Sequence, residues 1–207
     1  GALRVDALAE TLAAGAAGPT LVCLQAGNVN TGACDPFREA TALAHEHGAW
    51  VHVDGAFGLW AAASPRTRAL VDGIELADSW GCDGHKWLNV PYDSGFAVCS
   101  RPEVHAAAVR YSAPYLTGSG TAALAMSDFT LESSRRAKGL TVWALLRHLG
   151  RDGVAGVVDH LCAMARRFAE LLEAGGARIA NRVALNMVLV DFGDDARNAA
   201  IAAAVQA

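Results

Sequence analysis

A histidine and a lysine stand side by side at His85-Lys86, directly after Gly84 and before Trp87. A lysine normally keeps its hydrated ammonium in water, so apolar neighbours either cost solvation energy or prepare the amine to act as a nucleophile. Such amines form Schiff bases with aldehydes. Lys86 is therefore a candidate Schiff-base lysine, and the simpler alternative is a surface lysine whose stem packs past tryptophan.

An aspartate follows an apolar run, residues 50–53, that is typical of a buried strand. Asp54 would then stand at the carboxyl end of a strand, where open α/β sheets bind their ligands. Ala56 would lie on the same face of an extended chain. A carboxylate and a lysine at strand ends suit pyridoxal phosphate, whose aldehyde needs an amine and whose pyridine nitrogen needs an acid. His85 could donate to the phosphate, and a helix N-cap is the alternative role for Asp54.

Other reactive side chains point to ordinary structural roles. His45 and His47 are two residues apart on a predicted helix and so face different directions, and we assign no metal site. Arg135 and Arg136 could clamp a phosphate or carboxylate, or could form a helix-start ion pair, and both readings stay open. His52 is interpreted as a packed or hydrogen-bonded structural histidine.

The elements that must position these residues alternate between strand and helix. Extended runs predict four strands, at residues 20–24, 50–53, 77–80 and 95–99. Helical spacing predicts helices at 5–14 and 36–47, with Asp35 as the cap of the second and Gly48 as its stop. This alternation predicts an α/β fold with a mostly parallel sheet and crossover helices.

The rest of the chain reads as a lid and a second unit. Residues 111–130 predict a long loop able to close over a site. Helical patterns at 136–149 and 153–174, an extended 178–192 stretch and a helix from 196 follow. We therefore divide the chain at residue 145. Residues 146–207 are connecting helices and the start of a smaller α+β domain, and the family resemblance given below implies that residues 1–145 are the C-terminal part of a large cofactor domain.

Composition narrows the function classes. The 207 residues are 53% hydrophobic with a formal net charge of -4, and the 17 Lys and Arg form no basic stripe, which argues against nucleic acid partners. No apolar run approaches the roughly 20 residues of a membrane helix. Five scattered cysteines without a C-x-x-C pair favour a reducing cytoplasm. The chain opens at Gly1 without an initiator methionine and closes at Ala207 without a C-cap signal, so we expect a fragment that is poorly soluble or inactive by itself.

Several motifs in order resemble one known family, the group II pyridoxal-phosphate-dependent amino acid decarboxylases. They are His52-Val53-Asp54-Gly55-Ala56, Gly73-Ile74-Glu75-Leu76-Ala77-Asp78-Ser79, Asp83-Gly84-His85-Lys86-Trp87-Leu88-Asn89-Val90-Pro91, and Ser134-Arg135-Arg136 with Trp143. The resemblance implies the large domain of the fold-type I pyridoxal enzymes, used as a homodimer. It also implies that Lys86 carries the cofactor, Asp54 pairs with the pyridine nitrogen, Ala56 packs on the ring and His85 lies against the cofactor.

The resemblance implies a reaction as well: decarboxylation of an L-amino acid to an amine and carbon dioxide through a Lys86 Schiff base. An aminotransferase or carbon-carbon lyase of the same fold would use the same lysine and aspartate. A cofactor-incompetent dimer scaffold is the non-enzymatic alternative, favoured by one departure. Gly27-Asn28-Val29 stands where relatives carry Gly-Thr-Thr, so a hydroxyl is missing at Val29, and Asn30 or Thr31 could replace it.

Overall fold

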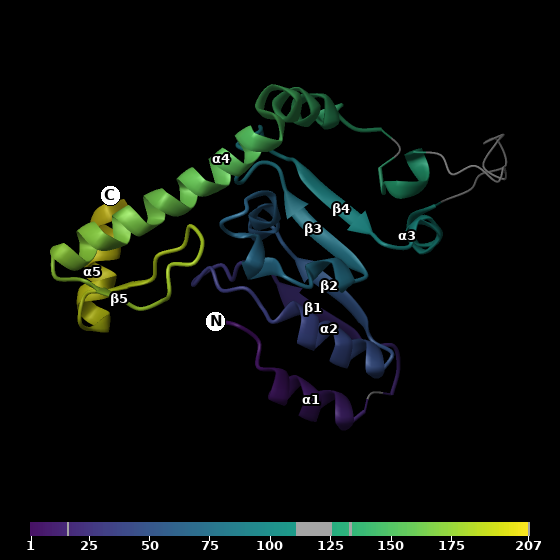
Figure 1. Ribbon diagram of the computed structural model, residues 1–207, viewed down its shortest axis with the longest axis horizontal. Coiled ribbons are helices and arrows are strands. Elements are labelled where there is room, and N and C mark those ends of the chain that lie inside the picture. The colour runs from purple at the N-terminus through teal and green to yellow at the C-terminus, as the bar shows by residue number, and fades with distance from the viewer. Residues whose placement is uncertain (16, 111–125, 133, 207) are drawn as a thin grey trace.

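Four strands form the central sheet, and their order in space follows their order in the chain (Figure 1). The computed structural model describes residues 1–15, 17–110, 126–132 and 134–206. The strands are β1 (Leu21–Gln25), β2 (Trp50–Asp54), β3 (Ser79–Asp83) and β4 (Gly95–Cys99). β1, β2 and β3 are parallel, and β4 returns antiparallel to β3. The predicted mostly parallel sheet is confirmed, although the third strand begins two residues later than expected.

One face of this sheet is the core of the molecule. Val22 and Leu24 of β1 and Val51 and Val53 of β2 are buried there, and they alternate with more exposed residues because successive side chains point to opposite faces. Helix α2 (Phe37–Glu46) packs on β2, and α1 (Val5–Ala13) packs on α2. Both helices lie on the same side of the sheet in Figure 1. The confirmed strand and helix pattern therefore reflects burial on one face.

The predicted cap of α2 is wrong. The residue at the N-cap position is Pro36, without a side-chain bond, and Asp35 uses its carboxylate elsewhere. Its two oxygens accept the backbone N–H of Leu3 at 2.7 Å and of Gln25 at 2.6 Å. Two backbone donors compete better for a buried carboxylate than one helix end. The predicted stop at Gly48 agrees with its φ of +70°, which favours glycine.

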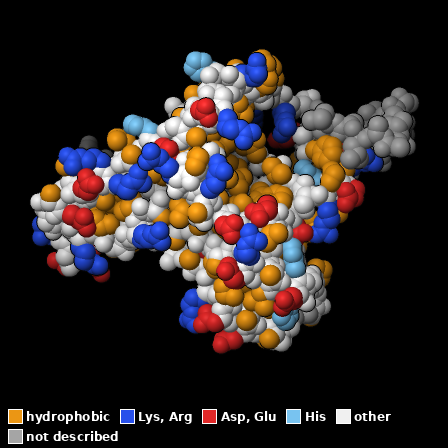
Figure 2. Space-filling model, viewed as in Figure 1, with side chains coloured by type: hydrophobic (Ala, Val, Ile, Leu, Met, Phe, Trp, Pro, Cys, Tyr) orange, Lys and Arg blue, Asp and Glu red, His pale blue; other side chains and the backbone are white. Residues whose placement is uncertain are grey.

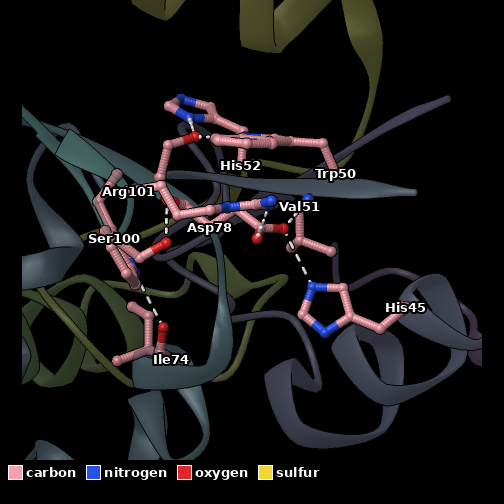
Figure 3. A network of polar contacts seen from close by, with 10 residues as sticks. His45, Trp50, Val51, His52, Ile74, Asp78, Ser100 and Arg101 are labelled. Atoms are coloured by element: carbon pink, nitrogen blue, oxygen red, sulfur yellow. Dashed lines mark hydrogen bonds and ion pairs between the residues drawn. The ribbon is translucent and has the colours of Figure 1, made fainter. Parts of the chain in front are cut away.

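A buried carboxylate joins α2, β2, β3 and the segment after β4 (Figure 3). Asp78 accepts hydrogen bonds from the Val51 backbone at 2.8 Å, from His45 Nε2 at 3.0 Å and from Arg101 Nη2 at 2.7 Å. The Arg101 guanidinium lies 4.4 Å from the ring centroid of Trp50. Burial raises the pKa of Asp78, but these three donors outweigh burial and hold the pKa below its usual range.

Short helices follow β2 and β4. They are the 3-10 helices η1 (Gly58–Ala63), η2 (Arg68–Val71) and η3 (Ile74–Leu76), then α3 (Pro102–Val109) and the 3-10 helix η4 (Met126–Phe129). Gly58 opens η1 against β1: a Cβ at this position would stand 2.0 Å from the Ala26 carbonyl oxygen. This close approach draws the segment after Asp54 onto the end of β1.

A long helix, α4 (Lys138–Ala174), leads away from the sheet to a hairpin of β5 (Arg178–Ile179) and β6 (Val190–Asp191) and to α5 (Asp195–Gln206) (Figure 1). The predicted pause at 150–153 is a single non-helical residue, Gly150, and the extended 178–192 stretch pairs only at its two ends. The predicted boundary at residue 145 falls inside α4. Most of the predicted 111–130 loop, residues 111–125, lies outside the described residues, and η4 occupies Met126–Phe129.

The visible surface mixes both signs of charge. On the face shown in Figure 2, Lys and Arg side chains are interspersed with Asp and Glu side chains and with hydrophobic ones. Within the described ranges, no helix combines the length and apolar character needed to cross a membrane.

Candidate active site

A cavity of about 870 Å³ opens at the carboxyl ends of β1 and β2 and the turn after β3. Its polar lining includes Gln25, Asp54 and Lys86, and Ala56 also lines it. Its other lining residues are mainly apolar: Gly27, Val29, Phe57, Trp87, Leu88, Asn89, Leu145, Leu149, Val157, Leu161, Asn186 and Met187. The structure thus brings together three of the four predicted site residues, Asp54, Ala56 and Lys86.

Asp54 owes its position to the strand pairing. It is the last residue of β2, and the parallel register sets it between Gln25 of β1 and Gly81 of β3. Its Oδ1 accepts the backbone N–H of Ala56 at 3.1 Å. Because η1 begins only at Gly58, Asp54 does not cap a helix, and that alternative is wrong. Its exposed carboxylate faces the cavity.

Lys86 lies on the turn between β3 and β4. The backbone N–H of Gly84 donates to the Ser94 carbonyl at 2.9 Å, which closes this turn. Lys86 Nζ is 3.0 Å from Asp83 Oδ2, and the lysine side chain is 41% exposed. Trp87 and Leu88 are buried and line the same cavity as Lys86. The lysine side chain is nevertheless partly exposed, and an ion pair with Asp83 holds its ammonium.

His85 is not among the residues that line the cavity. Its Nδ1 lies 2.7 Å from the Ser94 carbonyl oxygen and 3.2 Å from the Ser94 backbone N, and its ring stacks on Tyr92 with centroids 4.2 Å apart. Its Nε2 lies 3.6 Å from Asp83 Oδ2. His85 is the one predicted site residue that does not line the cavity with the other three.

The residues behind the lysine turn are inert. Cys82 is buried, and burial, followed by the nearby Asp83 charge, raises the pKa of its thiol to about 12. A thiol held protonated is a weak nucleophile, which suits a structural filler.

On β2, His52 Nδ1 is 2.9 Å from Ser79 Oγ, so the predicted structural histidine is confirmed (Figure 3).

The turn after β1 closes one side of the cavity. Val29 is 64% exposed and lines it. The Thr31 hydroxyl instead donates to Asn28 Oδ1 at 3.2 Å, and the same oxygen accepts the Asn30 backbone N–H at 3.0 Å. Neither Asn30 nor Thr31 is among the cavity residues, so neither supplies the hydroxyl missing at Val29.

No motif in the sequence indicates the far wall of the cavity. The wall is formed by α4 on both sides of Gly150 and by Asn186 and Met187, about 100 positions after the lysine. Asn186 lines this wall and carries a buried Oδ1 without a hydrogen-bond partner. Gln25 was also missed, although its place beside Asp54 follows from the pairing of β1 with β2.

The two arginines that could clamp an anion lie elsewhere. Arg135 Nη1 is 3.6 Å from Glu132 Oε2, which supports the ion-pair reading, and Arg136 lines a separate cavity at the start of α4. His45 belongs to the Asp78 network. Among the residues with described positions, no group of three or more His, Cys, Asp or Glu side chains is arranged to hold a metal ion.

A model of one protein family matches most of the chain. The family is described as the pyridoxal-dependent decarboxylase conserved domain, and the match spans residues 1–193. The chain is 33% identical over 172 residues to 4-hydroxyphenylacetaldehyde synthase from Rhodiola rosea, covering 82% of this chain and 34% of the relative. It is 31% identical over 152 residues to aromatic-L-amino-acid decarboxylase from Bacillus atrophaeus, covering 72% and 32%.

Solved structures share the fold. The structure of Oryza sativa TDC with PLP and tryptamine matches with a TM-score of 0.82 and 26% sequence identity. The match covers 90% of this chain and 40% of the Oryza sativa chain. The structure of Catharanthus roseus tryptophan decarboxylase in complex with L-tryptophan matches with a TM-score of 0.80 and 25% sequence identity. The match covers 94% of this chain and 40% of the Catharanthus roseus chain. The predicted partial α/β domain of this class is confirmed, and the chain spans about a third of the length of these curated relatives.

Proposed function

Because the chain belongs to the pyridoxal-dependent decarboxylase family, we propose that its protein decarboxylates an L-amino acid to an amine and carbon dioxide. The observation that carries this proposal is the meeting of Asp54, Ala56 and Lys86 in one cavity. These residues come from two different strand ends, so their meeting depends on the fold.

The cavity fits the reactive end of pyridoxal phosphate. Its volume of about 870 Å³ lies in the range of small-molecule sites. It offers one primary amine, one carboxylate and a small alanine that leaves room for a flat ring. The lining residues carry no hydroxyl or guanidinium group for the phosphate, within the described part of the chain. The fit therefore covers the aldehyde and the ring.

Each residue has a role that its chemistry supports. Pyridoxal phosphate, when bound, supplies an electron sink for the bond between Cα and the carboxylate. Lys86 would hold the aldehyde covalently, and Asp54 would hold a proton at the pyridine nitrogen. Ala56 would pack against the ring. We retain His85 as a neighbour of the cofactor on the basis of its place beside Lys86 in the chain.

We further propose that the intact protein is a cytoplasmic homodimer. The five cysteines, all present in the described ranges, are unpaired there, which suits a reducing compartment. Asp54 and Lys86 are exposed at the mouth of the cavity, which leaves a surface for a second subunit to cover. The domain division at residue 145 also stands as a proposal.

Aldehyde formation is the second candidate activity. Two relatives are named aldehyde synthases, the Rhodiola rosea protein and phenylacetaldehyde synthase from Petunia hybrida, which is 29% identical over 157 residues. Others are named decarboxylases. The product, an amine or an aldehyde, separates the two activities.

The test is an absorbance spectrum of the intact protein with pyridoxal phosphate, followed by borohydride reduction and peptide mapping. We expect a visible band and reduced cofactor on Lys86, both lost in Lys86→Ala. Lys138→Ala is the matched control, because Lys138 is the only other lysine of the chain and pairs with Asp93 outside the cavity. A folded protein without the band would favour the scaffold alternative. Amino acids are then screened for carbon dioxide, amine and aldehyde.

A further inference from the structure

One carboxylate lies between the two residues of the His-Lys pair. Asp83 Oδ2 is 3.0 Å from Lys86 Nζ and 3.6 Å from His85 Nε2. The Asp83 side chain is 27% exposed, so this oxygen is only partly hydrated. Because Nδ1 of His85 is engaged by the Ser94 carbonyl, the opposite ring nitrogen is directed toward Asp83.

The backbone of Asp83 is fixed on both sides. It is the last residue of β3 and pairs with Gly95 of β4. Its N–H donates to the Ala56 carbonyl at 3.0 Å, and its own carbonyl accepts the Trp60 indole N–H at 3.2 Å. The carboxylate therefore stands at a set position between the Ala56 segment and the lysine turn.

We propose that Asp83 is the positioning residue of Lys86, holding the ammonium at the cavity whenever the amine is not joined to the cofactor. This inference rests on the proposed function. A lysine that is released each time a substrate binds must keep its amine close to the cofactor site. Its four-carbon side chain would otherwise sample many rotamers. Asp83 supplies that place within hydrogen-bond distance.

The other groups around the amine leave this role to Asp83. Asp54 lines the same cavity, and its Oδ1 accepts the Ala56 backbone N–H. The wall from α4 contributes Leu145, Leu149, Val157 and Leu161, which carry no charge. Among the described residues, Asp83 is the acid that forms an ion pair with Lys86.

The experiment measures how fast a limiting acylating reagent modifies each lysine in the intact protein freed of cofactor. Only the neutral amine reacts, and a carboxylate neighbour favours the ammonium. For a partly exposed pair, we expect Asp83→Asn to raise the acylation rate of Lys86 by about two- to five-fold near pH 8.

Lys138 provides the matched control in the same sample. Its Nζ is 2.7 Å from Asp93 Oδ1, so Asp93→Asn should accelerate acylation at Lys138 and leave Lys86 unchanged. Peptide mapping reads both lysines at once, and thermal unfolding checks that each variant is folded. Asp83→Glu, which keeps the charge, should restore slow acylation of Lys86.

The outcomes separate the two proposals. No borohydride capture at Lys86 in the wild type overturns the proposed function and the role of Asp83 with it. Capture at Lys86 with unchanged acylation in folded Asp83→Asn overturns the role of Asp83 alone. If Asp83→Asn does not fold, NMR of wild type with 13C-methylated lysines decides: the Lys86 signal must move when acid protonates its carboxylate partner, and a static signal overturns the role.

Discussion

In the proposed site, the Asp54 carboxylate balances the charge of the protonated pyridine ring. Its amide substitute keeps the shape but cannot balance a charge or hold a proton on the pyridine nitrogen. We expect Asp54→Asn to weaken pyridoxal phosphate binding by about ten- to hundred-fold, the range for losing a hydrogen bond to a charged group. Equilibrium titration followed by absorbance measures this change.

Asp72→Asn is the control for Asp54→Asn. Asp72 forms an exposed pair with Arg38 far from the cavity, and its loss should leave cofactor affinity unchanged. Equal affinities of wild type and Asp54→Asn would contradict the assignment of Asp54.

The presence of a single residue in the cavity could be predicted where that residue lies close to the end of a predicted strand. Asp54, Ala56 and Lys86 follow or precede apolar runs whose strand character is plain in the sequence, and all three reach the cavity. The side chain of His85 was not predictable, because its ring direction depends on the Ser94 carbonyl, nine residues later. Asp83 escaped notice for a similar reason, since its carboxylate meets Lys86 only through the turn.

At the scale of elements, the Asp78 network predicts an acid-sensitive fold. The folded-state pKa of Asp78 is below its ordinary value, so its stabilising contribution is present above about pH 4 and is lost as the pH falls further. Removing one partner from a buried charge network costs about 3 kcal/mol. We expect Asp78→Asn to lower the free energy of unfolding by about this amount at pH 7 and by much less near pH 3.

Denaturant unfolding of wild type and Asp78→Asn across this pH range checks the expectation. Asp72→Asn again serves as the control, because its carboxylate is exposed and its loss should not change the unfolding free energy measurably. A difference between wild type and Asp78→Asn that stays constant from pH 7 to pH 3 would show that the carboxylate charge is not the cause.

Helices and strands could be predicted where buried residues recur at the regular spacing of a helix or a strand. The alternation of Val51 and Val53 with half-buried neighbours identifies β2, and α2 follows from its buried face. The cap at Asp35 could not be predicted, because its real partners, Leu3 and Gln25, come from two other parts of the chain. Local sequence does not reveal which of several backbone donors a carboxylate will choose.

At the scale of the whole molecule, a polar contact of Asp159 holds α4 against the segment after η1. Ser64, fully buried after η1, donates from Oγ to Asp159 Oδ1 at 2.5 Å, and Arg66 Nε lies 3.4 Å from the other oxygen. We expect Asp159→Ala to destabilise the docking of α4 by about 2 kcal/mol, the range for a charged hydrogen bond. Hydrogen exchange in α4 after Gly150 should accelerate accordingly.

Glu170→Ala on the same helix is the control, since Glu170 is exposed and forms an ion pair with the exposed Arg167. It should leave exchange in α4 unchanged. Exchange that is equally slow in Asp159→Ala would mean that apolar packing alone fixes the helix. The wall that α4 gives the cavity was not predictable, because it depends on where a long helix docks.

The match between strand order in space and strand order in the chain has a consequence for synthesis on the ribosome. Each strand can join the sheet beside its predecessor as it emerges, without waiting for a later partner. Asp54 and Lys86 can therefore reach neighbouring positions while α4 is still being made. The far wall, up to Met187, arrives about 100 residues after Lys86. During that interval the nascent chain would present its reactive lysine in a half-built cleft, with Asp83 already at its side.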